Sequence, residues 1–403
     1  MTRIFLEKTV HWWYYYFVKC EVILFSKKRG TVMILMDVKL NNIYGFTDFR
    51  MNFSYPKKIV NSIIDSEWLS GHPNFRYKKA VILMGANAAG KTTLGKALLN
   101  LFRFLNQQLD VAELSKMALA GQEASFSIDF INSGDILHRV NGYIMADDSN
   151  SHVKLRLGYS YTSIGKKDSY ETCAERLSQK TQEIVNFDRL NKVRDTIGKI
   201  HYVFSCPDIK PSSEISNIDQ DLALKVLRAV IGTLDPTLHD ISISRDLKNS
   251  FIIRRGTEEI IIQDGKLLNR DSLSSGTAEG IDISFFISLL FSGKNSFYYC
   301  DEHFSYIQSD IEKRIFGLML EHLEENEQLI FTTHNPDMLD LNMPKHSFAF
   351  LRKRGEAPHT TSVIFASDIL KRNTDSVHCA LENDMFDSIP DDTLLNELEK
   401  GCL

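Results

Sequence analysis

The chain has 403 residues, of which 43% are hydrophobic, so it can bury the core of one large domain or of two to three smaller ones. Its formal net charge of −5 argues against a protein coated in basic surface but is compatible with a local basic groove. The six cysteines are scattered and form no Cys-x-x-Cys pair. This argues against a zinc site or a disulfide framework and favours the reducing cytoplasm.

The N-terminal 32 residues are rich in aromatic side chains. The most apolar stretch, Val10 to Phe25, is interrupted by Lys19 and Glu21, so we expect no membrane span. It also lacks an Ala-x-Ala-like cleavage site, which argues against a signal peptide. We interpret residues 1–32 as an extension before the folded domain. Its tyrosines and tryptophans also suit a subunit contact.

Two strands are expected after the extension. Ile34 to Leu40 is almost continuously apolar, and Phe46 to Phe53 alternates apolar and polar residues. A loop with several polar residues follows. It leads to a short apolar run, Ala80 to Met84, which is typical of a buried parallel strand.

The stretch from Gly85 to Thr92 matches G-x-x-x-x-G-K-[ST], the phosphate-binding loop of P-loop NTPases. A helical pattern from Thr92 to Asn106 follows it, so the motif lies between a strand and a helix as it requires. Backbone N–H groups and the helix N-terminus can hold phosphate, Lys91 can bridge the β- and γ-phosphates, and the Thr92 hydroxyl can bind Mg²⁺. We assign nucleotide contacts to Gly85, Asn87, Gly90, Lys91, Thr92 and Thr93.

The middle of the chain predicts a strand meander followed by helices. Strands are expected at Ala124 to Ile131, Tyr143 to Ala146 and Val153 to Tyr161, one or two helices at Ala174 to Ile197, and a helix at Asp219 to Leu234. Three short strands at Ile241 to Ser244, Ser250 to Arg254 and Glu258 to Ile262 come next, and two more at Ser347 to Leu351 and Thr361 to Ala366 close the pattern.

Three further motifs lie in the second half of the chain. Leu273-Ser-Ser-Gly-Thr277 precedes an apolar helix from Ile281 to Phe291. The apolar run that starts at Phe297 ends in Asp301 and Glu302, and the run that starts at Gln328 ends in His334. A carboxylate at a strand end can hold Mg²⁺ beside Thr92, and the next one can activate water as a general base.

The order and spacing of these motifs resemble the ABC-type ATPases, which include SMC proteins, transporter nucleotide domains and the OLD group. The resemblance covers about Met33 to Leu351. It implies that Ser275 and Gly276 belong to the signature motif, which meets the nucleotide held by a second subunit. It also implies that Asp301 and Glu302 form the Walker B pair and that His334 is the switch histidine. The Q-loop glutamine is harder to identify, and Gln122 is our candidate.

The resemblance implies an α/β fold: an ABC-type ATPase head with a mixed central sheet flanked by helices, an antiparallel β subdomain and a short helical insertion. We divide the chain accordingly into an N-terminal extension (1–32), a lobe with the Walker A motif (33–170), a helical insertion (171–240), a lobe with the signature, Walker B and switch histidine (241–366), and an acidic C-terminal tail (367–403). The tail can be a solvated helix from Leu381 to Lys400 or a docking surface for a basic partner.

The segment between Lys91 and Ser275 is too short for an SMC-type coiled coil, and the segment after His334 is too short for the TOPRIM nuclease domain of OLD proteins. The pattern therefore resembles the single-domain ATPases of bacterial anti-phage systems, such as AriA of PARIS and PtuA of Septu. That resemblance implies an ATP- and Mg²⁺-dependent ATPase that forms a homodimer or higher homo-oligomer, responds to a phage-derived trigger and controls a separate nuclease or toxin.

Two rival hypotheses remain open. One is a DNA-repair ATPase that clamps DNA, for which the basic residues of the insertion are candidates: Arg176, Lys180, Arg189, Lys192 and Arg194. The other is a scaffold whose ATP is purely structural. The presence of both Glu302 and His334 argues against this second rival.

Overall fold

The computed structural model describes residues 32–60, 62–119, 121–132, 134–146, 153–180, 183–185, 187–206, 218–268, 273–294, 297–354, 360–372, 374–389 and 393–399. By internal contacts the chain divides into Met1–Gly30 and Thr31–Leu403. The interpretation of the N-terminal extension lies outside the described residues. Among the helices that are described, none has the length and apolar character needed to cross a membrane.

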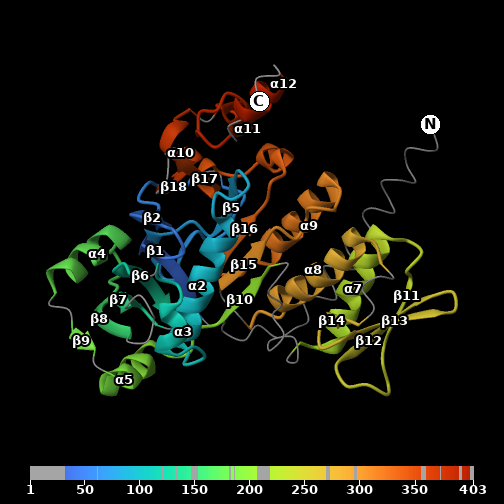
Figure 1. The fold of residues 1–403 in the computed structure, drawn as a ribbon, viewed down its shortest axis with the longest axis horizontal. Coiled ribbons are helices and arrows are strands. Elements are labelled where there is room, and N and C mark those ends of the chain that lie inside the picture. Colours follow the sequence, from blue (N-terminus) through green and yellow to red (C-terminus); the bar gives the residue numbers. More distant parts are fainter. Residues whose placement is uncertain are drawn as a thin grey trace. The chain divides into compact units, whose positions relative to one another are not determined.

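A six-stranded mixed sheet forms the centre of the second unit (Figure 1), in the order β10-β15-β16-β5-β17-β18. The strands are β5 (Ala80–Gly85), β10 (Tyr202–Ser205), β15 (Phe297–Asp301), β16 (Gln328–Thr332), β17 (Phe348–Arg354) and β18 (Thr360–Phe365). The first five in the sheet order run parallel, and β18 is antiparallel to β17. Because β15, β16 and β5 are adjacent and parallel, their carboxyl ends meet at one edge, where ligands bind in open α/β sheets.

Alternate residues of these strands enter two separate cores. Val81 and Leu83 face the core that contains α2 (Lys91–Leu105), whereas Ile82 and Met84 face the core that contains α8 (Ser275–Phe291) and α9 (Ser309–His322). The central sheet is thus buried on both faces, which is why its strands read as continuous apolar runs. This agrees with the predicted class of a mixed sheet flanked by helices.

An antiparallel sheet in the order β2-β1-β6-β7-β8-β9 covers the other side of α2. Its strands are β1 (Met33–Asn41), β2 (Phe49–Asn52), β6 (Ala124–Asn132), β7 (Ile136–Ala146), β8 (Val153–Ser163) and β9 (Glu183–Val185). The strand predicted from Phe46 begins only at Phe49, because Asp48 adopts a positive φ angle of 48° that interrupts the extended backbone. Phe46 instead packs beside the phosphate-binding loop, as described below.

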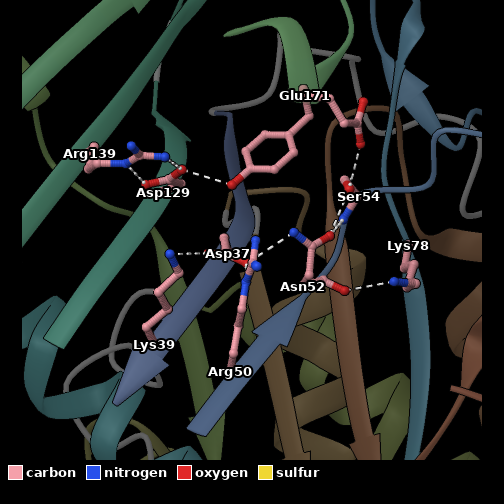
Figure 2. A network of polar contacts seen from close by, with 10 residues as sticks. Asp37, Lys39, Arg50, Asn52, Ser54, Lys78, Asp129, Arg139 and Glu171 are labelled. Carbon is pink, nitrogen blue, oxygen red and sulfur yellow. Dashed lines mark hydrogen bonds and ion pairs between the residues drawn. The ribbon is translucent and has the colours of Figure 1, made fainter. Parts of the chain in front are cut away.

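Hydrogen bonds connect α4 (Tyr170–Gln179) to polar side chains on the outer face of this sheet, among them a buried carboxylate (Figure 2). Asp37 and Asp129 lie opposite each other on β1 and β6, and each is paired with an arginine. The Tyr170 hydroxyl donates to Asp129 Oδ2 at 2.8 Å, and the Ser54 hydroxyl donates to Glu171 Oε1 at 2.9 Å. Burial raises the pKa of Asp37, and the facing carboxylate of Asp129 adds to that effect.

A smaller antiparallel sheet, β11 (Asp240–Ile243), β12 (Ser250–Arg255), β13 (Glu258–Gln263) and β14 (Lys266–Leu267), shares a core with α7 (Gln220–Leu234) and α8. The remaining elements are short: β3 (Trp68–Leu69), β4 (His72–Arg76), α3 (Val111–Ser115), α5 (Phe187–Ile197), η2 (Pro336–Asp340), η3 (Lys345–Ser347), α10 (Ala366–Ile369), α11 (Val377–Glu382) and α12 (Thr393–Glu399). Of the two alternatives for the tail, one acidic helix from Leu381 to Lys400 is wrong, because α11 ends at Glu382 and α12 covers only Thr393–Glu399.

The buried glutamate before β16 makes stability depend on pH. Burial raises the pKa of Glu327 from 4.5 to about 8. A carboxyl whose pKa is raised by folding destabilises the folded state wherever it would otherwise be ionised, so stability falls as pH rises between about 4.5 and about 8. We expect Glu327→Gln to be more stable than the parent, by at most about 3 kcal/mol at neutral pH and by much less at about pH 5. Urea unfolding at the two pH values checks this, and an equal difference at both would contradict it.

Candidate functional site

The loop between β5 and α2 has the backbone geometry of a phosphate cradle. Gly85 and Gly90 have φ angles of 156° and 109°, and Ala88 has φ 60°. A Cβ on Gly85 would lie 2.6 Å from the carbonyl oxygen of Leu351, and one on Gly90 would lie 3.2 Å from the ring of Phe46. Gly90 caps α2 without a side-chain hydrogen bond, so the first N–H groups of the helix are left for a ligand.

Lys91 is held inside this loop rather than extended into solvent. Its ammonium donates to the carbonyl oxygens of Gly85 at 2.8 Å and Ala86 at 3.3 Å and lies 3.2 Å from Glu302 Oε1. The side chain is only 2% exposed. Burial lowers the pKa of Lys91, and the carboxylates of Glu302 and Asp301 oppose this. The buried ammonium of Lys91 therefore lies at the loop where the motif predicts that phosphate binds.

A buried tyrosine joins the loop to the neighbouring strand. The hydroxyl of Tyr299 on β15 donates to the carbonyl oxygen of Lys91 at 2.7 Å. Its ring lies so close to Gly95 that a Cβ there would be 2.7 Å from the ring carbons. Gly95 thus allows α2 to approach β15, which sets the distance between Lys91 and the acidic strand end.

Asp301 at the end of β15 is fully buried. Thr332 Oγ1 donates to its Oδ1 at 2.6 Å, whereas Oδ2 has no hydrogen-bond partner among the described residues. Burial raises the pKa of Asp301, and the hydroxyls of Thr332 and Thr92 lower it. An unpartnered buried carboxylate oxygen beside a threonine hydroxyl fits a hard divalent cation such as Mg²⁺. The described residues contain no cluster of three or more His, Cys, Asp or Glu side chains that could hold a metal, so such an ion would also need phosphate and water oxygens.

Glu302 lies between the side chains of Lys91 and His334. Its Oε1 is 3.2 Å from Lys91 Nζ and 2.8 Å from His334 Nε2. Its backbone has φ 49°, a conformation rarely adopted by residues with a side chain, and its N–H donates to Thr332 Oγ1 at 3.1 Å. Such strain is commonly retained at functional sites. Three residues predicted for the site thus meet at one oxygen atom.

The loop that carries His334 is anchored by residues that the sequence analysis missed. Thr333 Oγ1 donates to Glu312 Oε1 at 2.7 Å, and Asn335 Nδ2 donates to Glu312 Oε2 at 2.7 Å. Glu312 lies in the first turn of α9, where an acidic residue is ordinarily explained by the helix dipole. The sequence therefore carried no signal for this role.

Ser275 and Gly276 begin α8, and the hydroxyl of Ser274 caps the helix by accepting the N–H of Thr277 at 3.1 Å. A Cβ on Gly276 would lie 2.7 Å from the carbonyl oxygen of Tyr306. No hydrogen bond or ion pair within the described part of the chain joins Ser275 or Gly276 to the phosphate-binding loop. The side chains of Asn87 and Gln122 are exposed. Within the described part of the chain, neither forms a hydrogen bond or ion pair with Lys91, Glu302 or His334.

No protein-family model and no curated protein sequence matches this chain. Solved structures with a similar fold include an SMC head bound to the C-terminal winged-helix domain of ScpA, with TM-score 0.49 and 12% identity, which covers 83% of this chain and 99% of that chain. The Thermotoga maritima SMC head domain has TM-score 0.43 and 14% identity and covers 82% of this chain and 98% of that one. A Pyrococcus furiosus Smc head bound to the C-terminal domain of ScpA has TM-score 0.49 and 11% identity, covering 88% and 99%. Likeness this distant does not extend to function.

Proposed function

We propose that this chain is an ABC-type ATPase that binds MgATP at the β5–α2 loop and hydrolyses it slowly. The observation that carries the proposal is the meeting of Lys91 and His334 at the carboxylate of Glu302, next to the unpartnered Oδ2 of Asp301. In the proposal these side chains act as phosphate-binding cation, general base and polar sensor at the shared carboxyl ends of the parallel strands β15, β16 and β5.

The proposed roles follow from the contacts. Lys91 and the free N–H groups of α2 bind the β- and γ-phosphates, and Gly85, Gly90 and Thr93 shape that cradle. Thr92 and Asp301 hold Mg²⁺, which when bound neutralises phosphate charge. Once ATP draws Lys91 and His334 to its phosphates, Glu302 is free to accept a proton from the attacking water, and His334 donates a hydrogen bond to the γ-phosphate.

We further propose that two copies complete each site. The N-terminus of α8 offers free N–H groups at the exposed Ser275 and at Gly276, and these have no described contact with the phosphate-binding loop of their own chain. The mass in solution, with and without ATP, tests this for the parent and for Glu302→Gln. An ATP-dependent dimer or multiple of dimers supports the proposal, and a monomer under every condition overturns the signature assignment.

Substituting Gly276 gives a sharper test of the same interface. In Gly276→Ala the new methyl group would meet the carbonyl oxygen of Tyr306 at 2.7 Å and displace residues 303–308 from α8. We expect ATP affinity per chain to stay within about twofold while ATP-dependent dimerisation weakens about tenfold. Gly317→Ala on α9 is the matched control, because nothing lies within 4 Å of its added Cβ. Calorimetry and sedimentation measure the two properties, and unchanged dimerisation would contradict the assignment.

The biological role that we propose is that of a cytoplasmic scaffold and sensor in anti-phage defence, which restrains a separate nuclease or toxin until a phage-derived trigger changes the ATP-bound assembly. The support is architectural analogy, because the order of the motifs resembles that of the single-domain anti-phage ATPases. Co-expression with the neighbouring gene tests it. A toxic product that becomes harmless only in the presence of the active ATPase is the expected result.

A DNA-clamping ATPase is the second candidate, and one surface favours it. The outer face of the antiparallel sheet carries exposed basic residues at Lys39, Arg50, Lys154 and Arg156. Tyr143 lies opposite Arg156, and Lys39 lies opposite Arg50. Of these four residues, Lys39 and Arg50 pair with Asp37. Among the insertion residues named above, Arg176 pairs with Asp168, Lys180 donates to the carbonyl oxygen of Tyr161, and Arg194 to that of Phe104.

The two candidates differ in their affinity for DNA. A clamp should bind duplex DNA with an affinity that falls steeply with salt, and Arg156→Gln together with Lys154→Gln should flatten that slope. Absence of salt-dependent DNA binding would leave the effector-controlling ATPase as the supported function.

A further inference from the structure

Both oxygens of the Glu312 carboxylate are used by the two residues that flank His334. Thr333 Oγ1 donates to Oε1 at 2.7 Å, and Asn335 Nδ2 donates to Oε2 at 2.7 Å. His334 itself extends from between these anchors to Glu302, with Nε2 2.8 Å from Oε1. The imidazole is therefore attached to a backbone segment whose neighbours on both sides are fixed to one side chain of α9.

Further bonds close this network. Asn335 Nδ2 also donates to Ser309 Oγ at 2.9 Å, and the Ser309 hydroxyl donates to Asp337 Oδ2 at 2.6 Å. The N–H of Asp337 donates to Asn335 Oδ1 at 3.0 Å and begins η2. Residues 333–337 are thus connected to the first turn of α9 at several points.

Glu312 is so deeply buried that its hydrogen bonds to Thr333 and Asn335 are unlike an incidental surface contact. Glu312 is 1% exposed, and none of the ion pairs in the described part of the chain gives it a cationic partner. Burial raises its pKa, which the hydroxyl of Thr333 and the amide of Asn335 oppose. Burying a carboxyl among neutral donors is unfavourable unless those donors are held in place. The network does hold them, on both sides of His334.

We propose that Glu312 is a positioning residue for the ATPase reaction, which fixes residues 333–335 so that His334 reaches both Glu302 and the γ-phosphate. This inference rests on the proposed function. Glu312 touches neither nucleotide nor reacting atoms, so it acts only through His334. Because α9 also follows directly after residues 303–308, the same helix connects the histidine loop to the segment that packs on Gly276.

The test is a double-mutant cycle between Glu312 and His334. Glu312→Gln leaves one acceptor oxygen, so its NH₂ group faces either the amide of Asn335 or the hydroxyl of Thr333, which already accepts the N–H of Asn335. In either orientation one of the two anchors is weakened. We expect kcat for ATP to fall about tenfold with KM changed less than about threefold, because a displaced group acts mainly on the transition state. In a His334→Ala background the same change should alter kcat less than about twofold. An equal fall in both backgrounds would make Glu312 merely structural and overturn the proposal, as would no fall in the parent.

Three further variants separate a positioning effect from misfolding. Adding Asn335→Asp to Glu312→Gln restores a donor opposite an acceptor and should recover kcat to within about threefold of the parent. Thr333→Val removes the bond to Glu312 from the other side, and Thr333→Ser should keep it. Glu327→Gln is the matched control, since Glu327 is also a buried glutamate but lies at the opposite end of β16.

A second readout does not need ATP hydrolysis. In nucleotide-free protein, hydrogen exchange of the amides of residues 333–337 should be faster in Glu312→Gln than in the parent and unchanged in Glu327→Gln. If the parent proves inactive with ATP, the proposed function fails, and faster exchange in Glu312→Gln then still supports the anchoring role. Equal exchange in the parent and Glu312→Gln would show that Glu312 does not hold the loop and would overturn the proposal.

Discussion

Replacing Glu302 with Gln is expected to lower kcat for ATP hydrolysis by about 100-fold or more, because an amide cannot accept the proton of the attacking water. The same change should tighten ATP binding about fivefold. In the structure the carboxylate is 3.2 Å from Lys91 Nζ and 2.8 Å from His334 Nε2, so it competes with phosphate for both groups. Glutamine is uncharged and competes less.

The two effects are measured separately, by steady-state phosphate release and by equilibrium binding of ATP at a temperature where the variant does not turn over. Glu327→Gln serves as the control, because it removes a buried carboxylate at the opposite end of β16 and leaves Asp301 and Glu302 in place. If Glu302→Gln hydrolysed ATP at the parental rate, Glu302 would not be the base. If binding instead weakened, the carboxylate would not compete with phosphate.

Replacing Lys91 with Met is expected to weaken ATP binding about 100-fold, because charge-assisted hydrogen bonds to phosphate are lost while the shape of the side chain is kept. Unfolding stability should change little, since Lys91 is a buried cation whose desolvation the new side chain avoids. The loop carbonyls of Gly85 and Ala86 would lose a donor, which limits any gain.

Isothermal titration with MgATP and thermal unfolding without nucleotide check these two expectations. Arg103→Met, in the last turn of the same helix, is the matched control for loss of one positive charge from α2. Unchanged ATP affinity in Lys91→Met would contradict the assignment of the phosphate site. A large loss of stability would instead show that the ammonium mainly holds the loop together.

The parts of the site that could be predicted are those encoded by local sequence. The glycines of the phosphate-binding loop have the positive φ angles that the motif requires, and the apolar runs before Asp301 and Thr333 form the parallel strands β15 and β16. Parallel strands place their carboxyl ends together, so the proximity of Lys91, Glu302 and His334 follows once the strand order is known.

What could not be predicted depends on contacts between distant residues. The whole of α9 was missed, although it provides Glu312 and Ser309 as anchors of the histidine loop. Its first turn follows directly after residues 303–308. The role of Tyr299 was hidden in the same way, because a buried tyrosine in a strand gives no sign that its hydroxyl reaches Lys91 on another element.

The close packing of Gly276 against Tyr306 has a consequence for how hydrolysis would respond to concentration. Because Gly276 packs closely on Tyr306, we expect a shift of the start of α8 to displace residues 303–308, which lead directly into α9, the helix that anchors the loop of His334. A second copy that bound at α8 would therefore change the position of His334 in the chain that it contacts. The specific activity should accordingly rise with protein concentration even at saturating ATP, because the hydrolysis rate of each chain depends on whether a second copy is bound to it.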